Sequence, residues 1–220
     1  MKRATVVLAD DHAIVLDGLR RILEPEFELV ATAADGRTLV EEVLRHKPDV
    51  AVVDVSMPLL NGLDALRQVK KTGAPTKFVF LTGSPEAAVA TQAFRSGAHG
   101  YVLKESASDE LMTAIRCALQ DQTYITPRIA NEVLKNLMHG AGTEQSPVLT
   151  AREREVLQLL AEGRNAKEIA VILNLSPRTI EFHRQNLSEK TGLRTIAELS
   201  RYAARHGLVP ESVAPNTDPS

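Results

Sequence analysis

The chain has 220 residues, 44% of them hydrophobic and 25% charged, which is usual for a globular protein of one or two domains. No apolar run approaches the roughly 18 residues of a membrane-spanning helix, and the N-terminus lacks the apolar stretch of a secretory signal. Cys117 is the only cysteine, which excludes an internal disulfide and favours a cytoplasmic location. Residues 1–121 carry 14 basic and 17 acidic side chains, whereas residues 149–207 carry 10 and 7. This uneven charge predicts two parts with different partners.

The first part alternates apolar runs with amphipathic segments. Runs typical of buried strands lie at 5–9, 27–33, 50–53, 77–81 and 100–103. Segments with the apolar spacing of helices follow at 15–23, 39–44, 63–71, 85–96 and 109–119. We expect Ser84 and Ser108 to cap the last two helices, with Pro85 in the first helical position. Five such pairs predict an α/β domain over residues 1–121, with helices on both faces of a parallel sheet.

Polar residues follow the predicted strands where ligands bind in such sheets, at the carboxyl ends. Asp10 and Asp11 follow the first strand and Asp54 the third, while Thr82 and Lys104 follow the fourth and fifth. Crowded carboxylates favour a hard divalent cation such as Mg²⁺, and an aspartate can attack phosphorus to form an acyl phosphate. A lysine and a hydroxyl suit the phosphoryl oxygens. Singly, these residues could be a helix cap, a turn residue and a surface charge; together they predict a phosphoryl-accepting site.

The motifs LADDH, DVSMPLLNG, LTGS and GYVLK resemble the receiver domain of bacterial two-component response regulators, over about residues 4–121. The resemblance implies a flavodoxin-like (βα)5 fold with strand order 2-1-3-4-5. It implies that a sensor histidine kinase phosphorylates Asp54, and that Mg²⁺ is held by Asp10, Asp11, Asp54 and the backbone carbonyl of Ser56.

Two positions need separate comment. Tyr101 matches the aromatic residue that, in receivers, turns inward when the Thr82 hydroxyl moves to the phosphoryl group; from the residues alone it is a packing residue at a strand edge. Glu105 follows Lys104 where a proline or aspartate is common in the family, so the local turn is expected to differ.

Residues 122–148 connect the two parts. We expect a short helix at 127–138 and a flexible linker at 139–148, which is rich in small and polar residues. Residues 149–207 have a helical pattern, in which Thr150 and Glu153 form a capping box and glycines 163, 192 and 207 end helices. The sequence predicts an all-α domain of four helices there, followed by a disordered tail at 208–220.

Two of these helices are joined by only three residues, Asn174 to Ser176, which is typical of a helix-turn-helix. Its second helix enters the major groove in DNA-binding proteins. Ile180 and Leu187 are expected to face the core. Candidate DNA contacts are the polar and aromatic residues on or beside the opposite face: Arg178, Thr179, Glu181, Phe182, His183 and Gln185. The alternative is a plain four-helix bundle with solvated charges.

The stretch LTAREREVLQLLAEGRNAKEIAVILNLSPRTIEFHRQNL resembles the LuxR-type DNA-binding domain, and the whole chain resembles NarL/FixJ-type regulators. The resemblance implies base reading by the helix that starts at Pro177, and phosphate contacts by Lys167, Thr179 and His183. Glu181 stands where many members have lysine; it could accept from cytosine or orient a neighbouring arginine. Phe182 could contact a thymine methyl or a partner subunit. The other histidines, His12 included, are interpreted as surface or packing residues.

The sequence therefore predicts a transcription regulator that binds double-stranded DNA as a homodimer when Asp54 is phosphorylated, without membrane association. One alternative is a phosphatase or phosphotransferase that turns over an acyl phosphate; Ser56 argues against it, because such enzymes usually have a second aspartate there. Another is a pseudo-receiver that binds DNA constitutively, against which the intact acidic pair, Thr82 and Lys104 argue.

Overall fold

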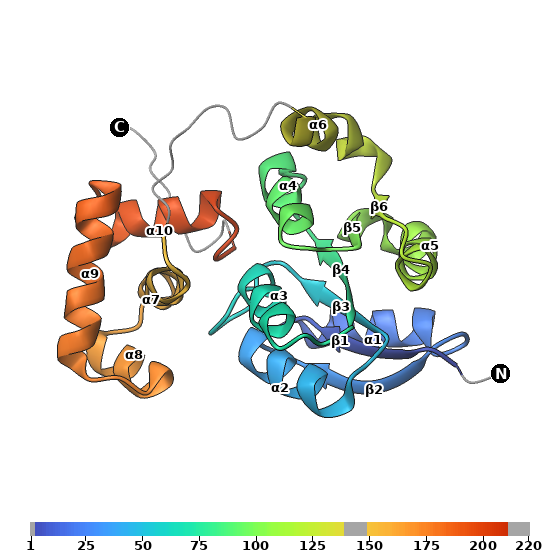
Figure 1. The fold of residues 1–220 in the computed structure, drawn as a ribbon, viewed down its shortest axis with the longest axis horizontal. Coiled ribbons are helices and arrows are strands. Elements are labelled where there is room, and N and C mark those ends of the chain that lie inside the picture. Colours follow the sequence, from blue (N-terminus) through green and yellow to red (C-terminus); the bar gives the residue numbers. More distant parts are fainter. Residues whose placement is uncertain (1–2, 139–148, 211–220) are drawn as a thin grey trace. The chain divides into compact units, whose positions relative to one another are not determined.

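The computed structural model describes residues 3–138 and 149–210, which fall into two compact units divided between residues 142 and 143 (Figure 1). None of the helices in these ranges has the length and apolar character needed to cross a bilayer. The predicted linker at 139–148 and most of the predicted tail lie outside the described residues.

The first unit is built on a six-stranded parallel sheet in the order β2-β1-β3-β4-β5-β6. The strands are β1 (Thr5–Ala9), β2 (Glu28–Ala33), β3 (Val50–Asp54), β4 (Lys77–Thr82), β5 (Gly100–Leu103) and β6 (Tyr124–Ile125). The predicted order of the first five strands is confirmed. All of β3 is buried, as its apolar, β-branched sequence predicts.

The sixth strand was not expected from the sequence. β6 has two residues only, and backbone hydrogen bonds place it: Tyr124 N donates to His99 O (3.0 Å) and Thr126 N donates to Tyr101 O (3.0 Å). The Thr126 hydroxyl in turn accepts from Leu103 N (3.2 Å). A pairing this short leaves no apolar run in the sequence by which to recognise it.

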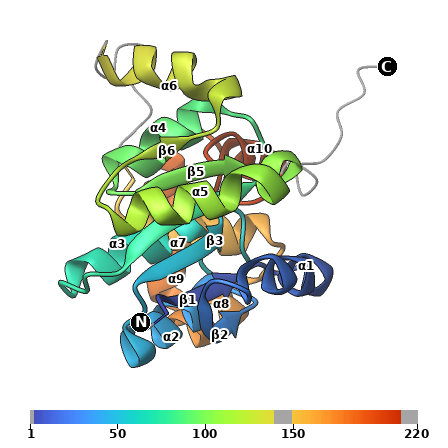
Figure 2. The same ribbon diagram turned by 90° about the vertical axis from the view of Figure 1, so that its right-hand side faces the viewer.

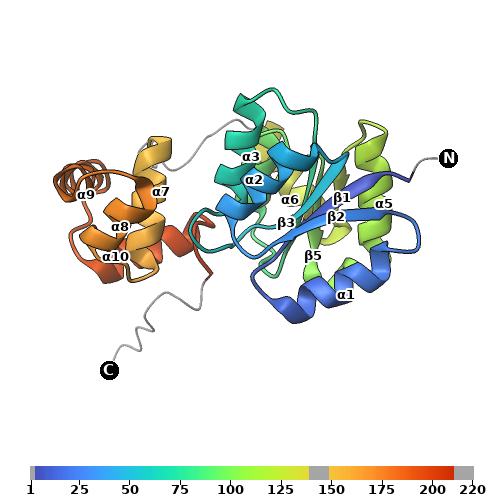
Figure 3. The same ribbon diagram turned by 90° about the horizontal axis from the view of Figure 1, so that it is seen from below.

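Helices cover both faces of the sheet (Figures 2 and 3). Side chains of α1 (Ala13–Leu23) and α5 (Ala107–Leu119) share one core cluster. The other cluster is formed by α2 (Gly36–His46), α3 (Gly62–Lys71), α4 (Ala87–Arg95) and α6 (Pro127–Met138). The helix α6 lies beside α4, and its Ile129 and Val133 join that cluster.

The expected caps of two helices are wrong. Ser84 and Pro85 precede α4, which begins at Ala87 after Glu86; Ser84 N donates instead to the Thr82 hydroxyl (3.2 Å). A 3-10 turn, η1 (Lys104–Ser106), precedes α5, so Ser108 falls inside that helix. Neither Ser84 nor Ser108 is therefore an N-cap residue.

Within residues 149–210, the second unit has four helices: α7 (Ala151–Ala161), α8 (Ala166–Leu173), α9 (Pro177–Thr191) and α10 (Ile196–Arg205). Each starts at a side-chain cap, from Thr150, Asn165, Ser176 and Thr195, and the Thr150 cap was predicted. Ile180 and Leu187 are fully buried, as expected for the inner face of α9. Leu208 and Val209, assigned from sequence to a disordered tail, are only 3% and 2% exposed.

Candidate functional site

The carboxyl edge of the sheet gathers the polar residues that the sequence singles out. Asp10 follows β1, Asp54 ends β3 and Thr82 ends β4, and all three are buried. Lys104, the first residue of η1, reaches across the edge. Its Nζ lies 2.6 Å from Asp10 Oδ2 and 2.7 Å from Asp54 Oδ2. One partly buried ammonium therefore lies between two buried carboxylates that come from different strands.

Burial and charge attraction compete in the electrostatics of Asp54 and Lys104. Burial raises the pKa of the Asp54 carboxyl above its ordinary value, because the attraction of Lys104 only partly offsets desolvation and the Asp10 charge adds repulsion. For Lys104, burial lowers the pKa, but the attraction of Asp54 and Asp10 outweighs it, so the pKa of the ammonium is raised. Asp54 is thus a desolvated carboxylate held by one ammonium and by Ser56 N, which donates to its Oδ1 at 3.3 Å.

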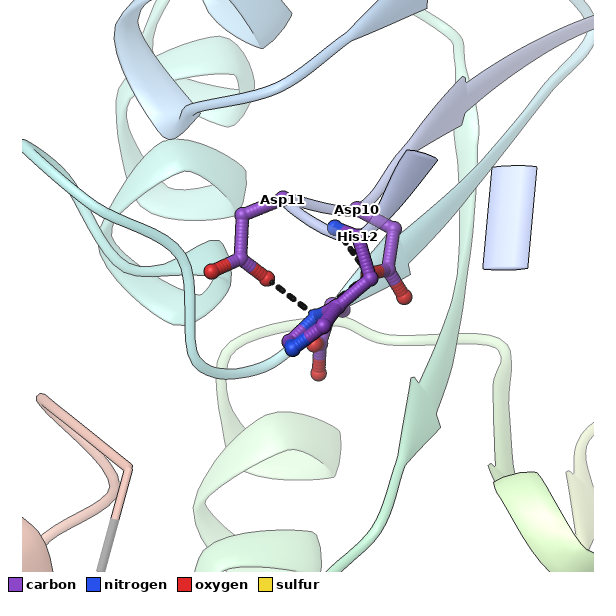
Figure 4. Close-up of side chains that lie close together, drawn as sticks. Asp10, Asp11 and His12 are labelled. Atoms are coloured by element: carbon purple, nitrogen blue, oxygen red, sulfur yellow. Dashed lines mark hydrogen bonds and ion pairs between the residues drawn. The ribbon is translucent and has the colours of Figure 1, made fainter. Parts of the chain in front are cut away.

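Asp11 and His12 complete the cluster on its solvent side (Figure 4). The Nδ1 of His12 lies 2.8 Å from Asp11 Oδ1 and 3.2 Å from Asp10 Oδ1. One potential ligand atom from each of Asp10, Asp11, His12 and Asp54 lies within 4.8 Å of the others. His12 is a surface residue, as interpreted from the sequence, but its ring also contacts the acidic cluster, which was not expected. The only signal in the sequence is its position directly after the acidic pair.

The donor set matches a divalent cation. Three carboxylates converge from two strand ends, and the Lys104 ammonium lies within 2.7 Å of an oxygen of two of them. Carboxylate oxygens around a partly open site are the ligands that Mg²⁺ prefers, because it keeps several waters. The arrangement is therefore compatible with metal binding at Asp10, Asp11 and Asp54.

Thr82 ends β4, and Tyr101 lies on the neighbouring strand β5, two residues before Leu103, the register partner of Thr82. The Tyr101 side chain is fully buried, and burial raises the pKa of its hydroxyl. That hydroxyl makes no hydrogen bond of ordinary geometry within the described part of the chain, and the nearby Thr82 hydroxyl only partly offsets the rise in its pKa. Its ring packs against Phe80 and Phe94, with centroids 6.4 and 6.5 Å away. Tyr101 is thus inward in this structure, with a hydroxyl free to be bonded.

The loop between Asp54 and α3 is held against the strand. Leu59 adopts a positive φ of 65°, and Gly62 N donates to Val55 O at 2.8 Å. A Cβ at Gly62 would lie 2.3 Å from the backbone oxygen of Asp54. Only glycine allows this approach, which fixes the position of the phosphoacceptor candidate relative to α3.

We expect Gly62→Ala to destabilise the first unit by about 1–3 kcal/mol, because backbone rather than a flexible side chain must move. Gly18→Ala is the matched control: it also adds one methyl at a helical glycine, but nothing lies within 4 Å of the new atom. The control should be neutral or stabilising. Denaturant unfolding measures both, and equal stability of the two variants would contradict the argument.

In the second unit, α8 and α9 form a helix-turn-helix joined by three residues. The outer face of α9 presents Arg178, Glu181, Phe182 and Gln185, all exposed. Phe182 is 60% exposed, so its ring is accessible to a ligand. A groove of about 560 Å³ runs beside this face, between α9 and the start of α10.

Several of these side chains are already oriented by neighbours. Arg184 Nη1 lies 3.2 Å from Glu181 Oε1, so the arginine that Glu181 could orient is Arg184. Gln185 Nε2 donates to Glu189 Oε1 at 2.9 Å.

The other predicted DNA contacts differ in accessibility. Lys167, on α8, is exposed. The Thr179 hydroxyl pairs with the capping Ser176 Oγ at 2.8 Å and is half-buried. His183 is half-buried, and its Nδ1 makes no hydrogen bond within the described residues. Arg178, Glu181, Phe182, Gln185 and Lys167 are therefore the more accessible of the predicted set.

Comparison with family models divides the chain in the same way. Residues 6–116 match the model described as "Response regulator receiver domain". Residues 147–203 match the model described as "Bacterial regulatory proteins, luxR family". The first match contains the acidic edge and the second contains α8 and α9.

Curated proteins and solved structures agree. The chain is 36% identical over 213 residues to the oxygen regulatory protein NreC of Staphylococcus carnosus, covering 93% of this chain and 98% of the relative. A structure of the RcsB response regulator of Salmonella typhimurium matches with a TM-score of 0.64 and 28% identity, over 94% of this chain and 99% of that one. An RcsB–DNA complex matches with a TM-score of 0.58 and 26% identity, over 92% and 98%.

Proposed function

Because the chain belongs to the response regulators that join a receiver domain to a LuxR-type DNA-binding domain, we propose that it is a DNA-binding regulator switched by phosphorylation of Asp54. The observation that carries the proposal is the convergence of Asp10, Asp54 and Lys104 at one edge of the sheet, within hydrogen-bond distance. This is the donor set that a carboxylate nucleophile toward phosphorus needs.

In the proposed reaction, an oxygen of Asp54 attacks the phosphorus of a phosphohistidine on a sensor kinase. A P–O bond forms, the P–N bond breaks, and the histidine regains a proton. Asp10, Asp11, Asp54 and the Ser56 carbonyl would hold Mg²⁺, which neutralises charge on the phosphoryl oxygens when bound. Lys104 and the Thr82 hydroxyl would contact the oxygens of the product.

We propose that Thr82 and Tyr101 respond to the negative charge of the phosphoryl group on Asp54. The Thr82 hydroxyl, at the end of β4, already accepts from Ser84 N in the turn that follows. Its movement to the phosphoryl group leaves room beside the Tyr101 hydroxyl, which is buried without a regular bond. An altered β4–β5 edge would then favour a second state of the receiver, to which dimerisation and DNA binding are coupled.

For the second unit we propose recognition of double-stranded DNA by α9, in a symmetric homodimer that contacts two half-sites. Gln185 and Arg178 are suited to base edges, and Lys167 to phosphates. Thr179 and His183 are the remaining proposed phosphate contacts, and Glu181 and Phe182 the remaining groove contacts. The Glu181–Arg184 pair reduces the repulsion that a free carboxylate would exert on the phosphate backbone.

The test is intact mass after incubation with acetyl phosphate and Mg²⁺, combined with DNA affinity for a site selected from random duplexes. We expect one hydroxylamine-labile phosphoryl group per chain and tighter, dimeric DNA binding. Sustained release of phosphate would favour the enzyme alternative. DNA affinity that ignores the donor, in a chain that carries the adduct, would favour a constitutive DNA-binding protein.

We expect Gln185→Ala to cost about 1–3 kcal/mol of discrimination at one base pair of the selected site, because one bidentate contact is lost. Lys167→Ala should instead weaken binding to all sequences alike and reduce the salt dependence. Competition binding with single-base variants of the site separates the two. Unchanged sequence preference in Gln185→Ala would remove this residue from the base-reading set.

A further inference from the structure

The side chain of His12 is placed in an unexpected way. His12 is the N-cap residue of α1, but it makes no side-chain hydrogen bond to the helix. Its imidazole turns back toward the carboxylates of Asp10 and Asp11 (Figure 4). Its own backbone N–H donates to Asp10 Oδ1 at 2.9 Å, which ties the residue to the cluster. The ring therefore belongs to the cation site rather than to the helix start.

We propose that His12 Nδ1 is a further ligand of the divalent cation at this site, and that it gives the site a preference for transition metals such as Mn²⁺ over Mg²⁺. The inference rests on the proposed function, because it concerns the same cation site. It adds a nitrogen donor to a set that otherwise consists of oxygens.

The spacing of the donor atoms supports this role. His12 Nδ1 lies 2.8 Å from Asp11 Oδ1 and 3.2 Å from Asp10 Oδ1. Adjacent ligand atoms in an octahedral shell with bonds of about 2.1 Å lie about 3.0 Å apart. The nitrogen can therefore share a shell with both carboxylates after only small shifts. The ring is 65% exposed, so solvation of its other nitrogen is not lost on binding.

Ligand chemistry sets the expected preference. Mg²⁺ takes oxygen ligands almost exclusively and retains waters, whereas first-row transition metals accept imidazole readily. A neutral imidazole bound through Nδ1 would thus favour first-row transition metals over Mg²⁺, with the smallest preference for Mn²⁺ and a larger one for its heavier neighbours. The alternative is that the ring blocks the site. It would then occupy the cation position in the metal-free protein and leave when any cation enters. Removal of the ring would then strengthen binding of every cation.

The experiment compares the full chain, without an added histidine tag, with His12→Asn and with the control His46→Asn. His46 makes a similar pair, with its Nε2 3.0 Å from Glu42 Oε2. It is the last residue of α2, whereas the first residue, Gly36, is the one whose N–H bonds to Pro58 O in the loop after Asp54. Pulsed electron paramagnetic resonance of bound Mn²⁺ reports directly coordinated nitrogen. Calorimetry measures the affinities for Mn²⁺ and Mg²⁺, and circular dichroism checks that each variant is folded.

We expect nitrogen coupling in the native chain and in His46→Asn, and its loss in His12→Asn. The same substitution should weaken Mn²⁺ binding by about tenfold or more, and Mg²⁺ binding by less than about threefold.

Three results would overturn the proposal. Bound Mn²⁺ without nitrogen coupling in the native chain removes His12 as a ligand but leaves the carboxylate site intact. Tighter binding of both cations by His12→Asn shows instead that the ring blocks the cation position. No binding of either cation by the native chain removes the cation site itself, and with it the metal-dependent part of the proposed function. Asp11→Asn, which should weaken both cations, shows whether the measured binding belongs to this cluster.

Discussion

Asp54→Asn should abolish phosphoryl acceptance and at the same time stabilise the first unit at neutral pH. The carboxylate is the proposed nucleophile, so no phosphoryl group should appear after treatment with acetyl phosphate and Mg²⁺. The stabilisation follows from burial, which makes the ionised Asp54 unfavourable in the folded state and raises its pKa. We expect a gain on the order of 1 kcal/mol, because the asparagine needs no compensating charge.

The pH dependence of this gain has a definite sign. Since the pKa of Asp54 is higher in the folded state than its ordinary value of 3.8, the folded state holds the proton more tightly. The contribution of the acid to stability is therefore greatest below the ordinary pKa and is lost as pH rises through the raised value. The advantage of Asp54→Asn should be absent in acid, grow through that range and then become constant. Thermal unfolding across this range measures it.

The control is Asp49→Asn, just before the other end of β3. Asp49 Oδ2 accepts from Thr5 N and from the Thr5 hydroxyl, both at 2.8 Å, so this carboxylate is well bonded where it stands. Asp49→Asn should keep the phosphoryl adduct and gain no stability. A phosphoryl group that persists on Asp54→Asn would show that another residue is the acceptor.

Lys104→Met should be strongly destabilising in a way that pH and divalent cations reverse. The substitution leaves Asp10 and Asp54, 1% and 6% exposed, without the cation they share. Removing one partner of a buried ion pair costs about 3 kcal/mol or more, because the remaining charge is left uncompensated. The loss should be largest at neutral pH and smaller in acid, where the carboxylates bind protons.

Mg²⁺ should restore much of this stability, because a bound cation replaces the missing positive charge. The double variant Lys104→Met with Asp54→Asn should be less destabilised than the sum of its parts predicts, since one of the stranded charges is gone. The raised pKa of Lys104 means that its own contribution is present at all pH values below the ordinary lysine range. Strict additivity, or a loss that does not depend on pH, would contradict the shared-cation interpretation.

Much of the fold and of the acidic edge could be predicted from sequence because both follow from periodicity. The Val50–Val53 run specifies a strand buried on both faces, and parallel order then brings the ends of β1, β3, β4 and β5 to one edge. That is enough to place Asp10, Asp54 and Lys104 together.

What could not be predicted depends on individual rotamers and backbone hydrogen bonds. The ring of His12 points back to Asp10 and Asp11 because of its side-chain rotamer, which a sequence pattern does not specify. The same is true of Arg184, one of several arginines that Glu181 could have oriented. Ser84 resembled a cap in sequence, yet its N–H bonds to the Thr82 hydroxyl.

The short pairing of β6 with β5 also determines where the first unit can be cut. A fragment that stopped after residue 121 would lose Tyr124 and Thr126, whose N–H groups bond to the carbonyls of β5 and of the residue before it. It would leave the edge of β5 unpaired, and it would uncover the apolar surface that Ile129 and Val133 protect. An unpaired edge next to exposed apolar surface favours self-association. For an isolated receiver that stays monomeric, residues up to 138 are the natural end point.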